Sequence, residues 1–229
     1  MTEATPEPLC EPVLKDLGVH HGFGQRRSQV PDLAFFPSQV HGIEVLDVRR
    51  EAGSTTVPAD VVVTADAGVS IGIVTADCVP ILAATTSGSA VVAIHAGWRG
   101  LAAGVIESGL RALRSKSEGE ALACAIGPAA RGCCYEVDDP VRIGLSSRYR
   151  DHLDEVLVSS HPGHFRLDLP LLAARILEAN GVQSSQIGTL HRVCTICDAE
   201  RFESYRRDGS RAGRLKHFIT RPGADPRQG

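Results

Sequence analysis

The chain has 229 residues, of which 43% are hydrophobic and 22% charged, a composition typical of a folded globular protein rather than a disordered one. A formal net charge of −3 and an aromatic content of 4% argue against nucleic acid or an anionic membrane surface as a partner. The apolar runs are too short for a membrane-spanning helix, and the first residues do not resemble an export signal. We therefore expect a cytoplasmic protein.

No internal repeat and no Gly/Ser-rich or Pro-rich linker divides the sequence. This predicts one domain over residues 18–220, preceded by a flexible lead-in at 1–17 and followed by a C-terminal tail at 221–229. The self-association of this domain is not indicated by any pattern in the sequence.

Four short runs rich in β-branched residues predict strands in the first half of the chain. They cover residues 60–64, 70–76, 79–85 and 90–95, and a further short strand is expected before them at 43–48. Apolar residues occupy both odd and even positions, so these strands are expected to be covered on both faces.

Helices and strands alternate in the second half. Helices are predicted at 101–113, 139–148 and 169–180, and strands at 121–126 and 187–191. Asp168 is expected to cap the third of these helices, and Gly181 to end it. Hairpins combined with crossover helices predict an α/β or α+β fold with a mixed sheet.

The hairpin formed by the strands at 79–85 and 90–95 can bring a cysteine and a histidine together. If residues 86–89 form a four-residue turn, Pro80 lies opposite His95, and Cys78 lies on the same face as a diagonal neighbour. A register shifted by one residue would send the two side chains to opposite faces.

His41, beside Gly42, is the candidate for a third ligand. One Cys and two His form the three-ligand pattern of a catalytic zinc, which keeps one coordination position open. The same set also occurs at blue-copper centres, but their axial methionine has no candidate here, since Met1 is the sole methionine. Spacing alone favours the simpler alternative, a core thiol and two hydrogen-bonded core imidazoles.

Several short motifs together resemble one protein family. They are QVHG at 39–42, TADCVP at 75–80, HAGWRG at 95–100, IGP at 126–128, YEV at 135–137, Cys194-Thr195, and SYRRDG at 204–209. The chain resembles the YfiH family, also called the laccase-domain or multicopper polyphenol oxidase family, from about residue 20 to residue 219. Family members usually carry a longer stretch with an Asn-Leu-Gly element where this chain has only residues 25–38, which puts its substrate preference in doubt.

The resemblance implies a fold and a metal centre. The expected fold is α/β (α+β), a single domain of two mixed β-sheets flanked by helices in four layers, α/β/β/α. The residues that match the family's metal ligands are His41, Cys78 and His95, and the implied metal is zinc, with copper a weaker candidate.

The resemblance also implies zinc-dependent chemistry on purine nucleosides: phosphorolysis of adenosine, inosine and methylthioadenosine, with adenosine deamination. The implied partners are a small purine nucleoside and phosphate. Asp77, Cys78 and Arg99 are the candidate catalytic residues, with Asp77 as proton shuttle or as orienter of a histidine ligand. Gln39, Arg99 and Arg207 are the candidate substrate contacts.

Two other activities remain open at this point. One is hydrolysis of a peptidoglycan precursor with Cys78 as nucleophile and His95 as base. The other is copper-dependent polyphenol oxidation, which needs several copper ions and more histidines than the motifs supply. A domain with a purely structural metal is the non-enzymatic alternative.

Cys194 and Cys197 form a C-x-x-C pair without a second such pair in the sequence, which favours structural thiols over a second zinc site. Cys133 and Cys134 are adjacent, which is poor geometry for a mutual disulfide.

Overall fold

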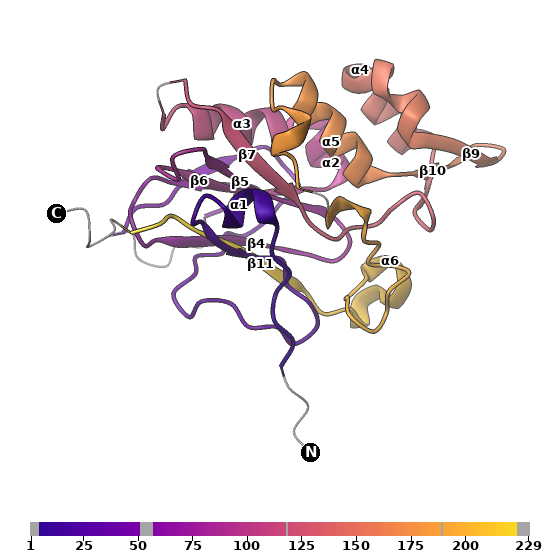
Figure 1. Ribbon diagram of the computed structural model, residues 1–229. Coiled ribbons are helices and arrows are strands. Elements are labelled where there is room, and N and C mark those ends of the chain that lie inside the picture. Colours follow the sequence, from indigo (N-terminus) through magenta and orange to yellow (C-terminus); the bar gives the residue numbers. More distant parts are fainter. Residues whose placement is uncertain (1–4, 51–56, 118, 189, 224–229) are drawn as a thin grey trace.

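The structure, a computed structural model, describes residues 5–50, 57–117, 119–188 and 190–223. A five-stranded sheet forms the centre of the fold (Figure 1). Its strands, in spatial order, are β2 (Val45–Asp47), β3 (Val61–Thr64), β6 (Val91–Ala96), β5 (Val79–Thr85) and β7 (Leu122–Ile126). Only β2 and β3 run parallel among the neighbouring pairs of this sheet, so the sheet is mixed. The β5–β6 hairpin pairs Pro80 with His95, which confirms the expected register.

Two three-stranded sheets complete the strand layers. In spatial order they are β1 (His20–Gly22), β11 (Leu215–Thr220) and β4 (Ser70–Thr75), and then β8 (Glu136–Asp138), β10 (His164–Leu167) and β9 (Leu157–His161). The three named strands of the first sheet pair antiparallel, and Phe35 adds a parallel bridge to Ile71 of β4, so this sheet is mixed as expected. The sheet of β8, β10 and β9 was not expected. The pairing of β11 between β1 and β4 is a long-range contact without a local signal, because β11 returns from the C-terminal end of the chain.

Four helices lie on one side of the five-stranded sheet (Figure 1). They are α2 (Trp98–Ala103), α3 (Val105–Arg114), α4 (Asp139–Val156) and α5 (Leu169–Ala179). The helix expected at 101–113 is divided in two because Gly104 adopts a left-handed conformation, with φ of 95°. α4 runs beyond residue 148 through a kink at Tyr149, and Asp168 caps α5 as expected by accepting from the Leu171 N–H.

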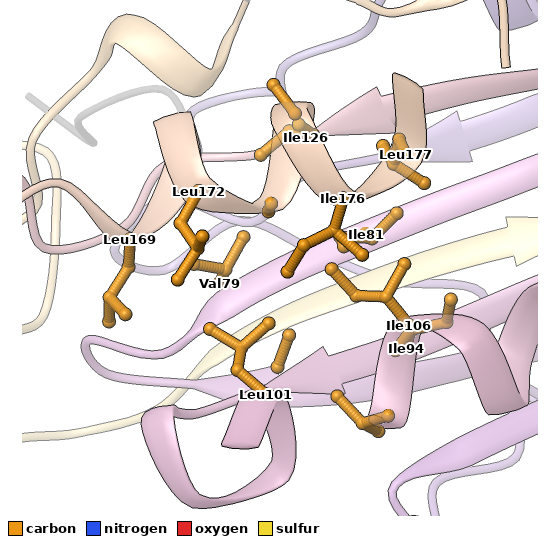
Figure 2. Packing of buried hydrophobic residues seen from close by; sticks show 14 of the residues in the cluster. Val79, Ile81, Ile94, Leu101, Ile106, Ile126, Leu169, Leu172, Ile176 and Leu177 are labelled. Atoms are coloured by element: carbon orange, nitrogen blue, oxygen red, sulfur yellow. The ribbon is translucent and has the colours of Figure 1, made fainter. Parts of the chain in front are cut away.

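The five-stranded sheet separates two apolar cores. Ile81 belongs to the core beneath the helices, where it packs with α3 and α5 (Figure 2). Its neighbour Leu82 belongs to the core between the five-stranded sheet and the sheet of β1, β11 and β4. Both side chains are fully buried. This alternation explains why the strand sequences are apolar at consecutive positions, as the prediction of two covered faces required.

The N-terminal residues differ from the expected flexible lead-in. Leu9 pairs with Phe23 across a β-bridge, and helix α1 (Pro12–Lys15) buries Leu14 completely in the core between the sheets. Burial of this side chain stabilises the segment by about 1.5–3 kcal/mol, and the two backbone hydrogen bonds between Leu9 and Phe23 add to it. Residues 1–4 and most of the expected tail, 224–229, lie outside the described residues.

Two further expectations need correction. The strand expected at 187–191 is, among its described residues, a single bridge at Ile187 followed by the 3₁₀ helix η2 (Leu190–Arg192). Apart from the four helices above, the α-helices of the described residues are α1 and α6 (Tyr205–Asp208), each of four residues, so long helices do not build the expected fourth layer. The α/β class, with several sheets flanked by helices, is confirmed. None of the described helices is both long and apolar enough to cross a membrane.

Candidate metal centre and active-site pocket

His41, Cys78 and His95 converge at one edge of the five-stranded sheet. Cys78 directly precedes β5, His95 lies in β6, and His41 lies in the loop before β2. The Cys78 Sγ lies 3.9 Å from Nε2 of His41, and one ligand atom from each of the three residues lies within 4.8 Å of the other two. The two imidazole rings are 4.8 Å apart between centroids and nearly perpendicular, at 76°. These are the donor types and the spacing that a zinc ion requires.

Asp60 organises this cluster from behind. Its carboxylate is fully buried and accepts a hydrogen bond of 2.7 Å from Nδ1 of His95. A carboxylate on one ring nitrogen fixes the tautomer of a histidine and leaves the other nitrogen, Nε2, free to bind a metal. Since the donor set and this buried carboxylate–histidine pair both match zinc sites, the residues present fit the metal that the family resemblance implies.

The same carboxylate shapes the loop that carries His41. The backbone N–H groups of Val40, His41 and Gly42 all donate to Asp60, at 3.2, 3.0 and 2.7 Å. His41 adopts a left-handed conformation, with φ of 61°, that is uncommon for a residue with a side chain. Three N–H donors on one buried carboxylate offset the strain of about 1–3 kcal/mol and hold the imidazole near Cys78.

The electrostatics favour a negatively charged sulfur. Burial by itself would raise the pKa of the Cys78 thiol, but hydrogen bonds from His41 and His95 outweigh it and lower the pKa to about 6. Burial opposes the charge on His95 in the same way, but its hydrogen bonds to Asp60 and Cys78 raise its pKa to about 9. The thiolate is the form of cysteine that binds metals and acts as a nucleophile.

Gly97 leaves room for the cluster. A Cβ at this position would lie 3.0 Å from the Cys78 Sγ and 3.0 Å from Cδ2 of His41, a tight contact that would displace these two ligands by a few tenths of an ångström. Its φ of −75° is open to any residue, so the glycine is required here by space and not by backbone conformation.

A pocket of about 630 Å³ opens over the three candidate ligands, a volume in the usual range for small-molecule sites. Polar and aromatic side chains surround it. Besides the three ligands, its side-chain lining includes Gln39, Asp77, Trp98, Arg99, Tyr135, Tyr205, Arg206 and Arg214.

Three arginines of the pocket pair with aromatic rings. The guanidinium of Arg99 lies 4.5 Å from the ring centre of Trp98, that of Arg206 lies 4.7 Å from Tyr135, and that of Arg214 lies 6.0 Å from Tyr205. Among the described residues, no carboxylate forms an ion pair with any of these three. Arg206 and Arg214 each donate through one nitrogen, Nη1, to backbone carbonyls, which do not neutralise the charge. The positive charge of the three arginines is therefore available to an anionic ligand.

Asp77 lies at the border of the pocket and connects it to the C-terminal segment. Its side chain is 8% exposed and accepts hydrogen bonds from Oγ1 of Thr195 (2.6 Å), Oγ of Ser204 (2.9 Å) and the backbone N–H of Arg206 (2.8 Å). It does not orient a histidine ligand, a role that Asp60 fills. Its expected part in proton transfer stays a prediction.

Gln39 and Arg207 already have internal partners. The Gln39 amide makes a two-way contact with the backbone of Val74, donating to its carbonyl at 2.7 Å and accepting from its N–H at 2.6 Å, although the side chain still borders the pocket. The five N–H groups of Arg207 all donate internally, to the carbonyls of Thr195, Ile196 and Phe202 and to Asp208. The expected substrate contact of Arg207 is therefore not supported, and Arg206 lines the pocket in its place.

Sequence reasoning missed Asp60 and Tyr135 as members of the site, and it indicated Arg206 and Arg214 only as part of a basic C-terminal stretch from which Arg207 was expected to contact the substrate. Asp60 had a usable signal, because an acidic residue at the start of an otherwise apolar, buried strand needs a specific partner. Arg206 and Tyr135 lay inside motifs already recognised, SYRRDG and YEV, but were not chosen. The only signal for Arg214 was its place in that basic stretch.

Comparison with known proteins identifies the family. A family model described as multi-copper polyphenol oxidoreductase laccase matches residues 24–222. The chain belongs to this family. The resemblance to YfiH proteins is confirmed as well, since the chain is 32% identical over 190 residues to Escherichia coli YfiH, covering 83% of this chain and 74% of that one.

Other relatives of this laccase-domain chain carry the name purine nucleoside phosphorylase. A protein of Xylella fastidiosa (strain Temecula1) with that name is 40% identical over 192 residues, covering 81% of this chain and 71% of its own length. One of Pseudomonas aeruginosa is 38% identical over 181 residues, covering 79% and 71%.

Solved structures share the fold. YfiH from Bacillus licheniformis superimposes with a TM-score of 0.82 at 24% identity, covering 96% of this chain and 98% of that one. YlmD from Geobacillus stearothermophilus gives a TM-score of 0.73 at 35% identity, covering 83% and 74%.

Proposed function

We propose that this chain is a zinc-dependent purine nucleoside phosphorylase, which accepts adenosine, inosine or methylthioadenosine, with adenosine deamination as an additional activity. The names of its relatives support the phosphorolytic reaction. The observation that carries the proposal is the pocket itself, in which a His2Cys cluster suited to zinc faces three arginines that have no carboxylate partner among the described residues.

The arginines and the metal ligands of this pocket would serve different parts of the reaction. Phosphorolysis joins a phosphate oxygen to C1′ of the ribose while the bond from C1′ to the purine nitrogen breaks, and the base leaves with the bonding electrons and a proton. The guanidinium groups of Arg99, Arg206 and Arg214 would bind and orient phosphate. Zinc held by His41, Cys78 and His95 would supply a Lewis acid for a polar atom of the substrate.

The aromatic side chains are suited to the nucleoside. Trp98, Tyr135 and Tyr205 lie around the pocket, where a purine ring can stack on or against them. Asp77, which accepts three hydrogen bonds, would act as an acceptor for a substrate hydroxyl or a proton.

The test is product analysis with the purified chain. Adenosine or inosine is incubated with and without phosphate, and the bases, nucleosides and ribose 1-phosphate are separated by chromatography. Phosphate-dependent release of adenine or hypoxanthine, with an equal amount of ribose 1-phosphate, is the expected result. Base release that does not need phosphate would contradict phosphorolysis, and conversion of adenosine to inosine would establish deamination. Cys78→Ala should abolish zinc binding at this site and turnover together.

The arrangement of Asp60, His95 and Cys78 favours a second candidate. A buried carboxylate, an imidazole and a thiol in series resemble the catalytic group of a cysteine hydrolase, so hydrolysis of a peptidoglycan precursor is the alternative activity. The two candidates compete for one sulfur, because a zinc-bound thiolate is a poor nucleophile. Chelation distinguishes them: removal of metal abolishes the zinc enzyme and spares or activates the hydrolase.

Copper-dependent polyphenol oxidation, which the family description names, is not proposed. Among the described residues, two groups of side chains are arranged so that they could bind a metal ion, and together they contain only two histidines, His41 and His95. Multicopper oxidation needs several copper ions, which favour imidazole donors.

A further inference from the structure

Four cysteines meet beside the pocket, in a cluster that the sequence does not suggest. Cys133 and Cys134 lie in the connection between β7 and β8, and Cys194 and Cys197 lie in the turn that follows η2. One sulfur from each residue lies within 4.8 Å of the other three, and the Cys197 Sγ is 2.7 Å from that of Cys134 and 3.4 Å from that of Cys133. The tertiary structure thus supplies the second cysteine pair that the C-x-x-C motif lacks in the sequence.

Hydrophobic packing does not account for this cluster. As far as the described residues go, neither apolar core includes any of its four thiols, whereas Cys124 is fully buried in the core beneath the helices. Cys133 and Cys197 are exposed and Cys134 is half-buried. Cys194 is buried, but the other three thiols of the cluster are wholly or partly accessible. Accessible thiols gain little from burial and are reactive toward oxidants, so a bound partner is a better explanation of the cluster than packing.

We propose that Cys133, Cys134, Cys194 and Cys197 bind a second zinc ion, with a structural role. Four thiolates around zinc, at about 2.3 Å each, form a tetrahedron with sulfur–sulfur edges of about 3.8 Å. Sulfur–sulfur distances of 2.7 and 3.4 Å, with all four sulfurs within 4.8 Å of one another, place the thiols close enough to surround one ion, although the two shortest distances must lengthen to reach this edge. Thiolates bound to the irons of an iron–sulfur cluster would lie farther apart, because they coordinate different metal atoms. Four protein donors leave no open position, in contrast to the three-ligand set of His41, Cys78 and His95.

The location indicates what this ion does. Tyr135, directly after Cys134, lines the pocket, and Thr195, directly after Cys194, donates to Asp77. The two segments already share a β-bridge between Ala129 and Cys194. A zinc ion would join them a second time, across 63 residues of sequence, and so fix one wall of the pocket. The inference does not depend on which reaction the pocket catalyses.

The test is the metal content of the untagged chain, purified anaerobically without added reductant and measured by elemental analysis. We expect two zinc ions per chain in the wild type, one in Cys78→Ala, one in Cys197→Ala and none in the double variant. Cys10→Ala, which changes an exposed cysteine outside both clusters, is the matched control and should keep two. Cobalt bound to Cys78→Ala should give the strong sulfur-to-cobalt absorption of a tetrathiolate site.

Several outcomes would overturn the proposal. One zinc in the wild type and none in Cys78→Ala would assign all bound metal to the first site. A disulfide between Cys134 and Cys197 in the anaerobically purified chain, found by mass spectrometry of unreduced peptides, would exclude the site, and iron at these sulfurs would exclude zinc. If Cys197→Ala does not fold, the zinc content of Cys78→Ala still tests the proposal, because this variant keeps all four cysteines of the cluster.

Discussion

Asp60→Asn is the sharpest perturbation of the candidate metal centre, because it conserves volume and removes only the charge and half of the accepting capacity. In the wild type, each carboxylate oxygen accepts two hydrogen bonds: Oδ1 from His95 and from the His41 N–H, and Oδ2 from the N–H groups of Val40 and Gly42. An amide in either orientation places its NH2 group against two of these four donors.

The magnitude follows from those contacts. Two buried donors left unsatisfied cost about 1–3 kcal/mol each, so we expect Asp60→Asn to lower the free energy of unfolding of the metal-free chain by about 2–6 kcal/mol. Without the carboxylate, His95 loses the group that fixes its tautomer, and zinc affinity should fall about 10–100-fold, or about 1.4–2.7 kcal/mol.

The assay is competition for zinc against a chromophoric chelator, combined with chemical denaturation of the metal-free chain. Asp47→Asn is the matched control: its exposed carboxylate pairs with Arg49 and Lys116 at the surface, and its loss should change neither quantity appreciably. A folded Asp60→Asn chain that binds zinc within twofold of the wild type would refute the role assigned to Asp60.

Three other predictions test the site and its surroundings. Gly97→Ala should weaken zinc binding at least tenfold in the same competition assay, because its Cβ would press on the Cys78 sulfur and the His41 imidazole. Gly42→Ala is the control and should have less effect, because its Cβ would meet no atom closer than 3.6 Å. An equal loss of zinc affinity in both variants would contradict the steric argument. Arg99→Ala should raise the KM for phosphate about 10-fold or more, because it removes a guanidinium from the proposed phosphate site. Arg142→Ala also removes a guanidinium that lies over an aromatic ring, but outside the pocket, and should leave this KM unchanged. An unaltered phosphate KM in Arg99→Ala would show that Arg99 does not bind phosphate. Burial, with the nearby charge of the metal-centre imidazole, lowers the pKa of His217 to about 3, so below the ordinary value of about 6.5 only the unfolded chain takes up this proton, and stability falls as the pH falls. Between pH 7 and pH 5, His217 should lower the free energy of unfolding of the wild type by about 2 kcal/mol. In denaturation curves, His217→Gln should lose about 2 kcal/mol less stability than the wild type over this pH range. An equal loss of stability in both chains would show that His217 is not the group responsible.

Local sequence determined the strands and the hairpin. Consecutive apolar residues such as Ile81 and Leu82 point to opposite faces of a strand, so the pattern alone required a sheet with a core on each side. The length of the turn after Thr85 set the register that places Pro80 opposite His95. The meeting of Cys78 with His95 could therefore be anticipated from the chain, and the motifs around them identified the family.

The tertiary structure decided the partners that come from distant segments. Successive residues of helix α6 point about 100° apart, so the orientation of the helix against the sheet, which the motif does not encode, sends Arg206 to the pocket and Arg207 to internal carbonyls. Asp60 meets His95, and Cys133 meets Cys197, only because folding brings together strands and loops that have no periodic relation along the chain. Hydrophobic periodicity reports which face of an element is buried, whereas the identity of the buried polar neighbour depends on packing between elements.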